Sequence, residues 1–208
     1  MKNMINQLPP KKIKLSSLLV GPIKNGYSPV CIDKPTSKKI LSLSALNGLG
    51  LNFNETKWVP EENTRINNFI IRPGDFLVSR SNTLDKVGRA ALYKGGLKNC
   101  SYPDLMMRFR ANEKKINLDF LELILQSPDA RKHFMRRASG TSTSMVKITK
   151  AAVESLEIPN LGLEKQKVIV KAIKEWDSAI EKTEGLITAK ARQFDRSIRP
   201  HRTGLKLL

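Results

Sequence analysis

The sequence predicts an α+β fold, in which a mixed α/β domain over residues 1–160 is followed by one long, coiled-coil-like helix over residues 161–199. In the first part, short apolar runs alternate with Gly, Pro and Asn, which is typical of short strands and helices joined by tight turns. From residue 163 to residue 199 there is no Pro, and Gly185 is the only Gly. Residues 200–208 are expected to form a flexible tail.

Two strands of the domain are expected at residues 76–78 and 90–93, where apolar runs flank a polar loop. Residues 105–110 predict a further strand, whose period of two places Arg108 and Arg110 on one face.

Three helices are expected to begin at polar capping residues, because the side chains of Asn, Ser and Thr accept hydrogen bonds from the first helical N–H groups. The second of these helices has Pro128 in its first turn and is expected to end at Gly140. Residues 140–149 are expected to form a polar loop that leads into the third helix. The three caps are Asn117, Ser127 and Thr149.

The long helix carries an apolar stripe at heptad spacing. At about 1.5 Å per residue, roughly 37 residues form a helix near 55 Å long, which exceeds the usual width of a domain of this size. The stripe needs a partner, which is either the domain itself or a second helix of the same kind. Because the chain contains no second long helix, self-association is favoured. The residues expected at the dimer interface are Ile169, Ile173, Trp176, Ile180, Ile187 and Phe194.

The charge of the chain predicts a polyanionic partner. There are 37 Lys and Arg against 19 Asp and Glu, a formal net charge of +18. Residues 1–163 carry 26 of the basic and 13 of the acidic residues. The domain is therefore expected to bind nucleic acid, and the helix to act as a connector. A basic but otherwise ordinary enzyme and a ribosome-associated protein remain as alternatives.

The remaining composition indicates a cytoplasmic protein. Cys31 and Cys100 are far apart, without the spacing of metal ligands, as in reduced intracellular proteins. There is no run of 18 apolar residues, so no membrane partner is expected. The N-terminal stretch lacks the apolar core of a signal peptide.

The polar loop between the first two strands is the main candidate site. Arg80 and Arg89 can fork onto phosphate oxygens or guanine edges, and Asn82 suits bidentate contact with adenine. The alternative is structural: Asn82 shapes a turn, and Arg80 pairs with Asp75 or Asp85.

Catalytic motifs are largely missing from the sequence. It contains no complete phosphate-binding glycine loop and no His/Cys cluster. One pattern, Pro103-Asp104 followed by Glu113 and Lys115, is similar to that of Mg²⁺-dependent nucleases. That chemistry needs the Glu and the Lys on a strand, whereas residues 111–117 read as a loop. A Mg²⁺ nuclease therefore stays as an alternative function.

With these residues in view, the chain resembles the specificity subunit of type I restriction–modification enzymes. The resemblance is carried in order by "RPGDFLVSRSNTLDKVGRAALY" (72–93), "CSYPDLMMRFR" (100–110) and "GTSTSMVKITKAAVESLEIPNLGLEKQKVIVKAI" (140–173). The long helix that follows also matches, whereas residues 1–71 match only loosely. The family usually has Glu-Gln where this chain has Glu164-Lys165-Gln166.

The resemblance implies a DNA target recognition domain at residues 1–160 and a conserved dimerisation or spacer helix at 161–199. Such proteins are non-catalytic and bind double-stranded DNA. Methyltransferase subunits bring S-adenosylmethionine, and a restriction subunit brings the nuclease, so no cofactor or metal is expected on this chain. Members usually carry two such units, so a homodimer of this chain would read a bipartite inverted repeat. The alternative is a non-functional fragment of a longer specificity chain.

The residues expected at DNA fall into three groups. Those assigned to phosphate contacts are Lys24, Lys86, Arg89, Arg108, Arg110 and Lys147. Those assigned to base contacts are Asn25, Tyr27, Ser44, Asn47, Arg80 and Asn82. The polar loop with Thr141 and Ser142 is expected either to contact phosphates or to cap the next helix.

Overall fold

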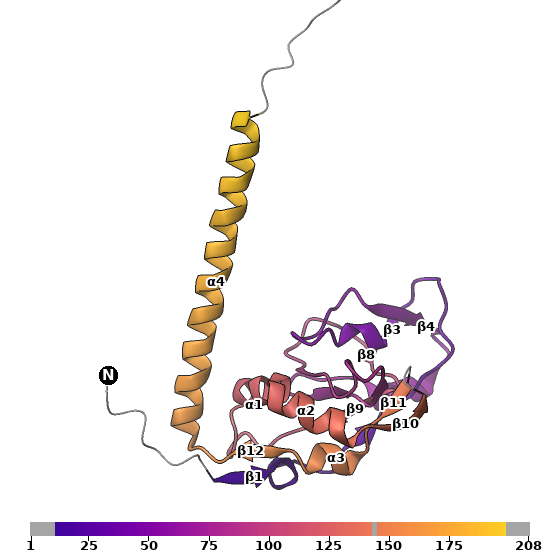
Figure 1. Cartoon of the computed structure of the whole chain (residues 1–208). Helices are drawn as coiled ribbons and strands as arrows, with labels where there is room; N and C mark the ends of the chain where they lie inside the picture. Colours follow the sequence, from indigo (N-terminus) through magenta and orange to yellow (C-terminus); the bar gives the residue numbers. More distant parts are fainter. Residues whose placement is uncertain (1–10, 143–144, 199–208) are drawn as a thin grey trace, which may run out of the picture. The chain divides into compact units, whose positions relative to one another are not determined.

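The computed structural model describes residues 11–142 and 145–198, without the side chains of residues 141–142 and 196–198 (Figure 1). The predicted α+β class is confirmed: short strands and helices are followed by one long C-terminal helix. By its internal contacts the chain divides into two units, residues 1–167 and 168–208. The expected tail, residues 200–208, lies outside the described residues.

A four-stranded antiparallel sheet forms the centre of the first unit, with the strand order β2-β9-β5-β7. Two of the strands confirm the pair predicted around the polar loop, and a third confirms the predicted strand in residues 105–110. Leu77 stands opposite Arg108 on one side and Ala91 on the other. The bounds of the strands are β2 Lys24–Asn25, β5 Phe76–Ser79, β7 Ala90–Leu92 and β9 Met106–Phe109.

Two smaller sheets join segments that are distant in the sequence. In the first, β3 pairs antiparallel with β4 and parallel with β8. In the second, β1 pairs with β12, so the start and the end of the domain lie side by side (Figure 1). The bounds are β1 Lys12–Lys14, β3 Lys38–Leu41, β4 Thr56–Val59, β8 Cys100–Ser101 and β12 Glu157–Pro159.

The prediction that residues 140–149 form a polar loop is wrong. A third small sheet is built there, in which β10 (Ser139–Ser142) pairs with β11 (Met145–Lys147). β11 also pairs with β6 (Ser81–Asn82). The Gly, Thr and Ser residues of this segment are not typical of strands, so its sequence did not predict this pairing. The pairing brings this segment against the polar loop that follows β5.

All three predicted helix caps are confirmed. The side chains of Asn117, Ser127 and Thr149 each accept a hydrogen bond from a backbone N–H three residues later. The second helix ends at Arg137 rather than at Gly140, because β10 begins at residue 139. The α-helices of the domain are α1 Leu118–Gln126, α2 Pro128–Arg137 and α3 Lys150–Glu154, and its 3-10 helices are η1 Leu15–Leu18, η2 Leu43–Ala45 and η3 Thr64–Phe69.

The core packs on both faces of the central sheet. On one face, Leu77, Ala91 and Met106 share a buried cluster with side chains of β3 and β8, which form the upper layer in Figure 1. On the other face, the rings of Phe76 and Phe109 stack at 5.1 Å between centroids. Packing on both faces holds the central sheet rigidly in place. Side chains at the ends of its strands therefore have fixed positions.

Helix α1 closes the exposed edge of the sheet at β7. A carboxylate oxygen of Glu122 accepts a hydrogen bond from the N–H of Leu92 at 2.9 Å. Lys94 pairs with Asp119 and Glu122 at 3.0 and 2.9 Å. Burial would lower the pKa of Lys94, but the hydrogen bonds and charges of these two carboxylates outweigh it and raise the pKa. The free edge is thus covered rather than left open to another strand.

The long helix α4 extends over Leu163–Ile198, 36 residues, or about 54 Å. Gln166, in its first turn, is 2% exposed; its side chain accepts a hydrogen bond from the N–H of Asn117 and donates one to the carbonyl of Leu161. Across residues 11–142 and 145–198, no helix is long and apolar enough to cross a membrane.

We predict that Gly26→Ala strongly destabilises the domain. A Cβ at residue 26 would lie 2.2 Å from the carbonyl oxygen of Pro103 and 2.3 Å from that of Tyr102, and both are backbone atoms. Overpacking of this kind typically costs about 3 kcal/mol or less, and the upper end is expected here because backbone cannot move aside cheaply. Urea unfolding should show a lower midpoint. Gly162→Ala, with open space around the new Cβ, is the matched control and should unfold as the wild type does.

Candidate nucleic-acid interface

Backbone hydrogen bonds hold the base of the polar loop between β5 and β7. The N–H of Ser79 donates to the carbonyl of Arg89, and the N–H of Gly88 donates back to the carbonyl of Ser79, both at 2.8 Å. On the other side, the N–H of Arg80 donates to the carbonyl of Leu105 at 2.8 Å. The side chains of this loop are therefore presented from a rigid base.

The polar side chains of the loop have partly structural roles. The Oδ1 of Asn82 accepts a hydrogen bond from the N–H of Thr83 at 2.9 Å, and its Nδ2 donates a long one, 3.4 Å, to the hydroxyl of Ser79. Arg80 pairs with neither Asp75 nor Asp85 among the described residues; its guanidinium donates a long bond, 3.4 Å, to the carbonyl of Asp104. Arg80 therefore keeps most of its donors for a ligand.

Charge in the loop is only partly balanced. Arg89 lies 4.0 Å from Asp85, and the hydroxyl of Thr83 donates to the same carboxylate at 2.5 Å. This hydrogen bond, with smaller contributions from Lys86 and Arg89, lowers the pKa of Asp85. Lys86 is exposed at the tip. One carboxylate thus faces several cations, and the loop stays positive.

Two further segments bring predicted residues to this loop. β11 places Lys147 opposite Ser81. A Cβ at Gly48 would lie 3.6 Å from Nε of Arg89, so the segment that holds Asn47 lies beside the loop. We call the combined surface the reading face; it consists of Asn47, Arg80, Asn82, Lys86, Arg89 and Lys147.

Helix α2 braces the loop from behind. The guanidinium of Arg131 donates to the carbonyls of Val87 and Asp85 at 2.5 and 2.9 Å. Gly88 adopts a positive φ of 73°, and a Cβ there would lie 2.6 Å from the side chain of Phe134. Burial, and then the nearby charge of Arg89, lower the pKa of Arg131. Arg131 therefore positions the loop and is not available for a phosphate.

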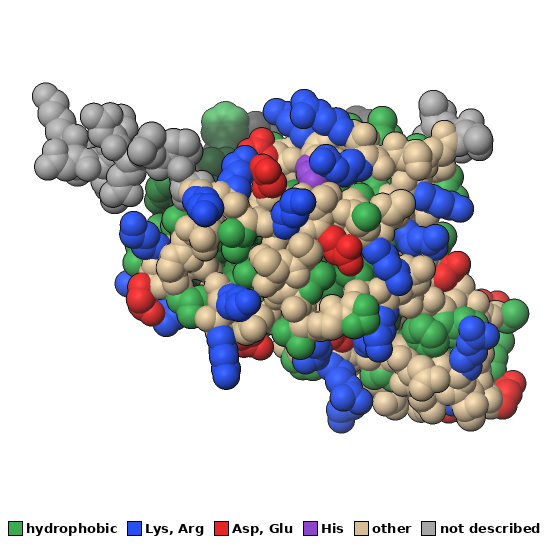
Figure 2. Space-filling view, turned by 90° about the horizontal axis from the view of Figure 1, so that it is seen from below, with side chains coloured by type: hydrophobic (Ala, Val, Ile, Leu, Met, Phe, Trp, Pro, Cys, Tyr) green, Lys and Arg blue, Asp and Glu red, His purple; other side chains and the backbone are tan. Residues whose placement is uncertain are grey.

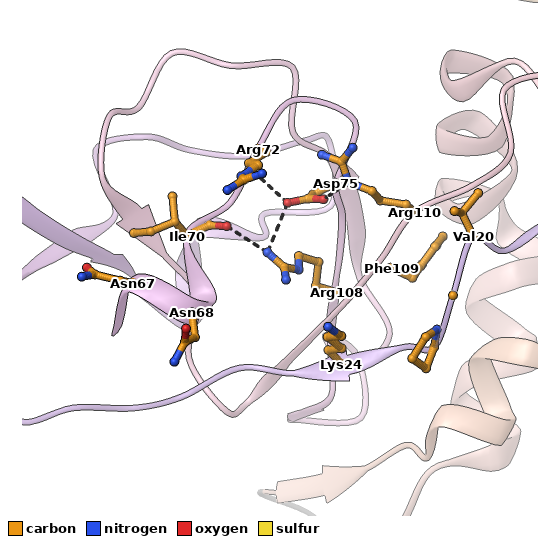
Figure 3. Close-up of a pocket in the computed structure, with 12 residues that line it drawn as sticks. Val20, Lys24, Asn67, Asn68, Ile70, Arg72, Asp75, Arg108, Phe109 and Arg110 are labelled. Atoms are coloured by element: carbon orange, nitrogen blue, oxygen red, sulfur yellow. Dashed lines mark hydrogen bonds and ion pairs between the residues drawn. The ribbon is translucent and has the colours of Figure 1, made fainter. Parts of the chain in front are cut away.

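Three other predicted residues, Lys24, Arg108 and Arg110, lie together at the opposite end of the central sheet. They line a cavity of about 460 Å³ that also contains Asp75 and Arg72 (Figure 3). The prediction that both arginines point to the same side is confirmed, because the guanidinium groups of Arg108, in β9, and of Arg110, directly after it, both bond to the carboxylate of Asp75.

The remaining predicted residues lie elsewhere and have partners of their own. The ring of Tyr27 lies 4.3 Å from the guanidinium of Arg65 and 5.6 Å from the ring of Phe69. The hydroxyl of Ser44 donates to the carboxylate of Glu55. The Oδ1 of Asn25 is buried without a hydrogen-bond partner among the described residues. The side chains of Thr141 and Ser142 lie outside the described residues.

Positive charge is not confined to the reading face. Figure 2 shows Lys and Arg side chains spread over the lower side of the domain in Figure 1, with fewer acidic ones between them. Charge alone therefore does not locate a nucleic-acid interface on this domain, and the local arrangement of donors has to do so.

The nuclease-like pattern is not assembled into a metal site. The carboxylate of Asp104 accepts a hydrogen bond from the hydroxyl of Ser28 at 2.5 Å. Glu113 and Lys115 lie in a turn, not on a strand. In the part of the chain that the structure describes, no three His, Cys, Asp or Glu side chains group to hold a metal ion. Nothing in this arrangement supports the nuclease alternative.

Comparison with known proteins identifies the family. The model for the family described as "Type I restriction modification DNA specificity domain" matches residues 19–189. This chain belongs to that family. The match includes the reading face, the cavity at the other end of the sheet and most of α4, so all of these features lie within the specificity domain.

Two curated relatives are specificity subunits from Escherichia coli. The type I restriction enzyme EcoKI specificity subunit of strain K12 is 27% identical over 134 residues, which are 64% of this chain and 28% of the relative. The EcoEI specificity subunit is 22% identical over 144 residues, which are 67% of this chain and 24% of that relative. The matched part of this specificity domain thus spans about a quarter of each curated relative.

Solved structures share the fold of this specificity domain. An S subunit from M. genitalium superposes with a TM-score of 0.58 at 16% identity, covering 93% of this chain and 46% of that one. The HsdS subunit from Thermoanaerobacter tengcongensis superposes with a TM-score of 0.60 at 16% identity, covering 98% of this chain and 53% of that one. The chain therefore spans about half of each of these structures.

Sequence reasoning missed three residues that organise the specificity domain. Asp75 was expected only as part of a turn or as a partner of Arg80, and Arg72 only as part of that turn. Arg131 belongs to a basic run that is typical of a solvated helix face. Asp75 acts through Arg108 and Arg110, and Arg131 through the loop at residues 85–87, all more than 30 positions away in the sequence. Periodicity carries no signal for such contacts. The N–H of Arg72 contacts only Asp75, three positions away.

We predict that Arg131→Met loosens the loop without unfolding the domain. The variant keeps the apolar stem but removes two hydrogen bonds to backbone carbonyls, worth about 1 kcal/mol together after allowance for solvent screening. Amide hydrogen exchange should become roughly fivefold faster at Lys86, Val87 and Gly88. Lys132→Met, on the exposed side of the same helix, should leave these rates unchanged. Equal rates in both variants would show that α2 does not brace the loop.

Proposed function

We propose that this chain is a DNA sequence-recognition module of a type I restriction–modification system. The observation that carries the proposal is the reading face. There the polar loop, β11 and the segment of Asn47 lie side by side. Their Arg and Asn side chains are of the type that contacts base edges, and their Lys side chains are of the type that contacts phosphates. Family membership over residues 19–189 supports the same function. The module itself performs no catalysis. Methyltransferase subunits supply S-adenosylmethionine and methyl transfer, and a restriction subunit supplies cleavage.

The proposal assigns different work to Arg80 and Lys86. Arg80 lies at the rigid base of the loop, and its planar guanidinium group can donate two parallel hydrogen bonds to a guanine edge. Lys86 is a flexible point charge at the exposed tip, which suits a phosphate. Sequence preference and salt dependence should therefore respond to different substitutions.

We predict that Arg80→Lys weakens base preference while keeping the salt dependence of binding. The charge stays but the fork is lost, which should reduce discrimination at one base pair by about 1–3 kcal/mol. Lys86→Gln should do the reverse: affinity falls for all sequences, and the slope of log K against log salt becomes shallower by about 0.9. The measurements are selection from a random duplex pool and titrations at several salt concentrations.

The matched control is Lys114→Gln, which removes an exposed cation from the turn after β9. It should change neither quantity. A wild-type protein that selects no sequence from the pool, alone or with a methyltransferase partner, would overturn the proposed function.

Dimerisation through α4 is the second part of the proposal. Large apolar side chains at heptad spacing are exposed along this helix: Trp176 by 67%, Ile180 by 55%, Ile187 by 64% and Phe194 by 64%. A continuous exposed stripe of this kind is typical of a helix that pairs with another. With Ile169 and Ile173, these residues would form the interface between two copies.

A dimer with two-fold symmetry would read two identical, inverted half-sites with unread base pairs between them. The length of α4 sets the gap at about one turn of DNA, roughly 34–36 Å, or somewhat more. A single, non-palindromic preferred site selected by the purified protein would contradict this arrangement.

We predict that Ile180→Asp produces monomers that keep weak, non-specific DNA binding. A carboxylate in the centre of the stripe would have to be buried in the paired state, which is strongly unfavourable. Sedimentation at several concentrations measures the change. Lys182→Asp, off the stripe on the same turn of the helix, should leave the dimer intact. If Ile180→Asp sediments as the wild type does, the stripe does not hold the dimer.

A further inference from the structure

The cavity at the far end of the central sheet is built from four separate segments. β2 contributes Lys24, β9 contributes Arg108, and Arg110 follows directly after β9. The turn before β5 contributes Arg72 and Asp75. The remaining side is lined by Asn67 and Asn68, at the end of η3, and by Ile70, which follows it. The volume is about 460 Å³. Figure 3 shows the three arginines around Asp75, with Lys24 farther away on β2.

The carboxylate of Asp75 is the only negative charge among the lining residues, and it is fully engaged. It is 2% exposed. Its Oδ1 accepts from Nε of Arg110 at 2.6 Å, and its Oδ2 accepts from the N–H of Arg72 at 2.8 Å and from Nη1 of Arg108 at 3.5 Å. Four cations against one carboxylate leave an excess of three positive charges.

The unused donors are on the open side of the cavity. Among the described residues, the side chains of Lys24 and Arg72 make no hydrogen bond or ion pair, and both are exposed. The guanidinium of Arg110 is held by Asp75 and by the carbonyl of Pro73, and that of Arg108 by Asp75 and the carbonyl of Ile70. Two arginines are thus oriented in advance, and two cations remain to complete a site.

We infer that this cavity binds one phosphate group of a DNA strand, an inference that rests on the proposed function. Pre-oriented guanidinium groups and an excess of positive charge suit a tetrahedral oxyanion, because several N–H groups can donate to it at once. Asp75 orients the arginines but cannot neutralise them. Asn67 and Asn68 line the same cavity, beyond Ile70 from the arginines (Figure 3).

The position of the cavity favours DNA over a small phosphate compound. Asp75 precedes β5 and Arg80 follows it, so five residue steps, or about 16 Å, separate the cavity from the reading face. The major groove is about 12 Å wide, so a duplex with its base edges at the reading face could have a backbone phosphate near the cavity. Two contacts at the two ends of one rigid strand would fix the direction in which DNA crosses the domain.

The test combines a double variant with chemically modified DNA. Lys24→Gln with Arg72→Gln removes the two unpaired cations, and both are exposed, so the fold should persist. For wild-type protein, a neutral methylphosphonate scanned along the half-site should weaken binding at a position outside the bases that are read. The double variant should show no further loss at that position. Its slope of log K against log salt should be shallower by about 0.9.

The matched control is Lys114→Gln with Lys115→Gln, which removes two exposed cations from a turn outside the cavity lining. It should keep the methylphosphonate effect. The bases selected from a random pool should be the same for wild type and double variant. A double variant with the wild-type slope and an unchanged methylphosphonate effect would overturn the inference.

Titration with inorganic phosphate and pyrophosphate separates the two sources of a phosphate group. If the double variant loses binding of these small anions but keeps the wild-type salt slope and methylphosphonate profile, the occupant is a free phosphate compound, and the assignment to DNA is wrong. If wild-type protein binds DNA without sequence preference, the proposed function fails instead. The salt slope and the methylphosphonate scan would still report on the cavity.

Discussion

The structure of the domain depends on one buried carboxylate, that of Asp75. It closes the turn before β5 through the N–H of Arg72, and it joins this turn to β9 through Arg108 and Arg110. It is almost completely shielded from water. A buried charge is stable only when it is paired and hydrogen-bonded, so the ends of both strands are held where these donors can reach it. Since the same strands lead at their other ends to the reading face, the geometry of that face depends on this contact too.

The polar loop follows the same principle at the other end of the sheet. Its backbone is fixed by hydrogen bonds to Ser79 and Leu105, and Arg131 holds it from α2. Buried or half-buried cations therefore orient the backbone, while exposed ones such as Lys86 remain for a ligand. This division explains why a domain with so many cations can still present a defined pattern of donors: the cations that matter for structure are already bonded.

The sequence predicted those features that depend on local spacing. The caps Asn117, Ser127 and Thr149 and the strands around the polar loop follow from residues that are close in the chain. The hairpin of β10 and β11 could not be predicted, because Gly, Thr and Ser give no alternation and its stability comes from pairing with β6, about 60 residues earlier. For the candidate site, Arg80 and Asn82 were identified, but the contacts of Asp75 and the brace at Arg131 depend on tertiary packing.

The exposed stripe of α4 would couple the two proposed activities. If two copies pair through it, each half-site bound by one domain raises the effective concentration of the second half-site for the other. A modest affinity at each reading face would then suffice for tight binding to a bipartite target, and a single half-site would be bound weakly. Specificity would thus come from the spacing set by the paired helices as much as from the bases contacted at each end.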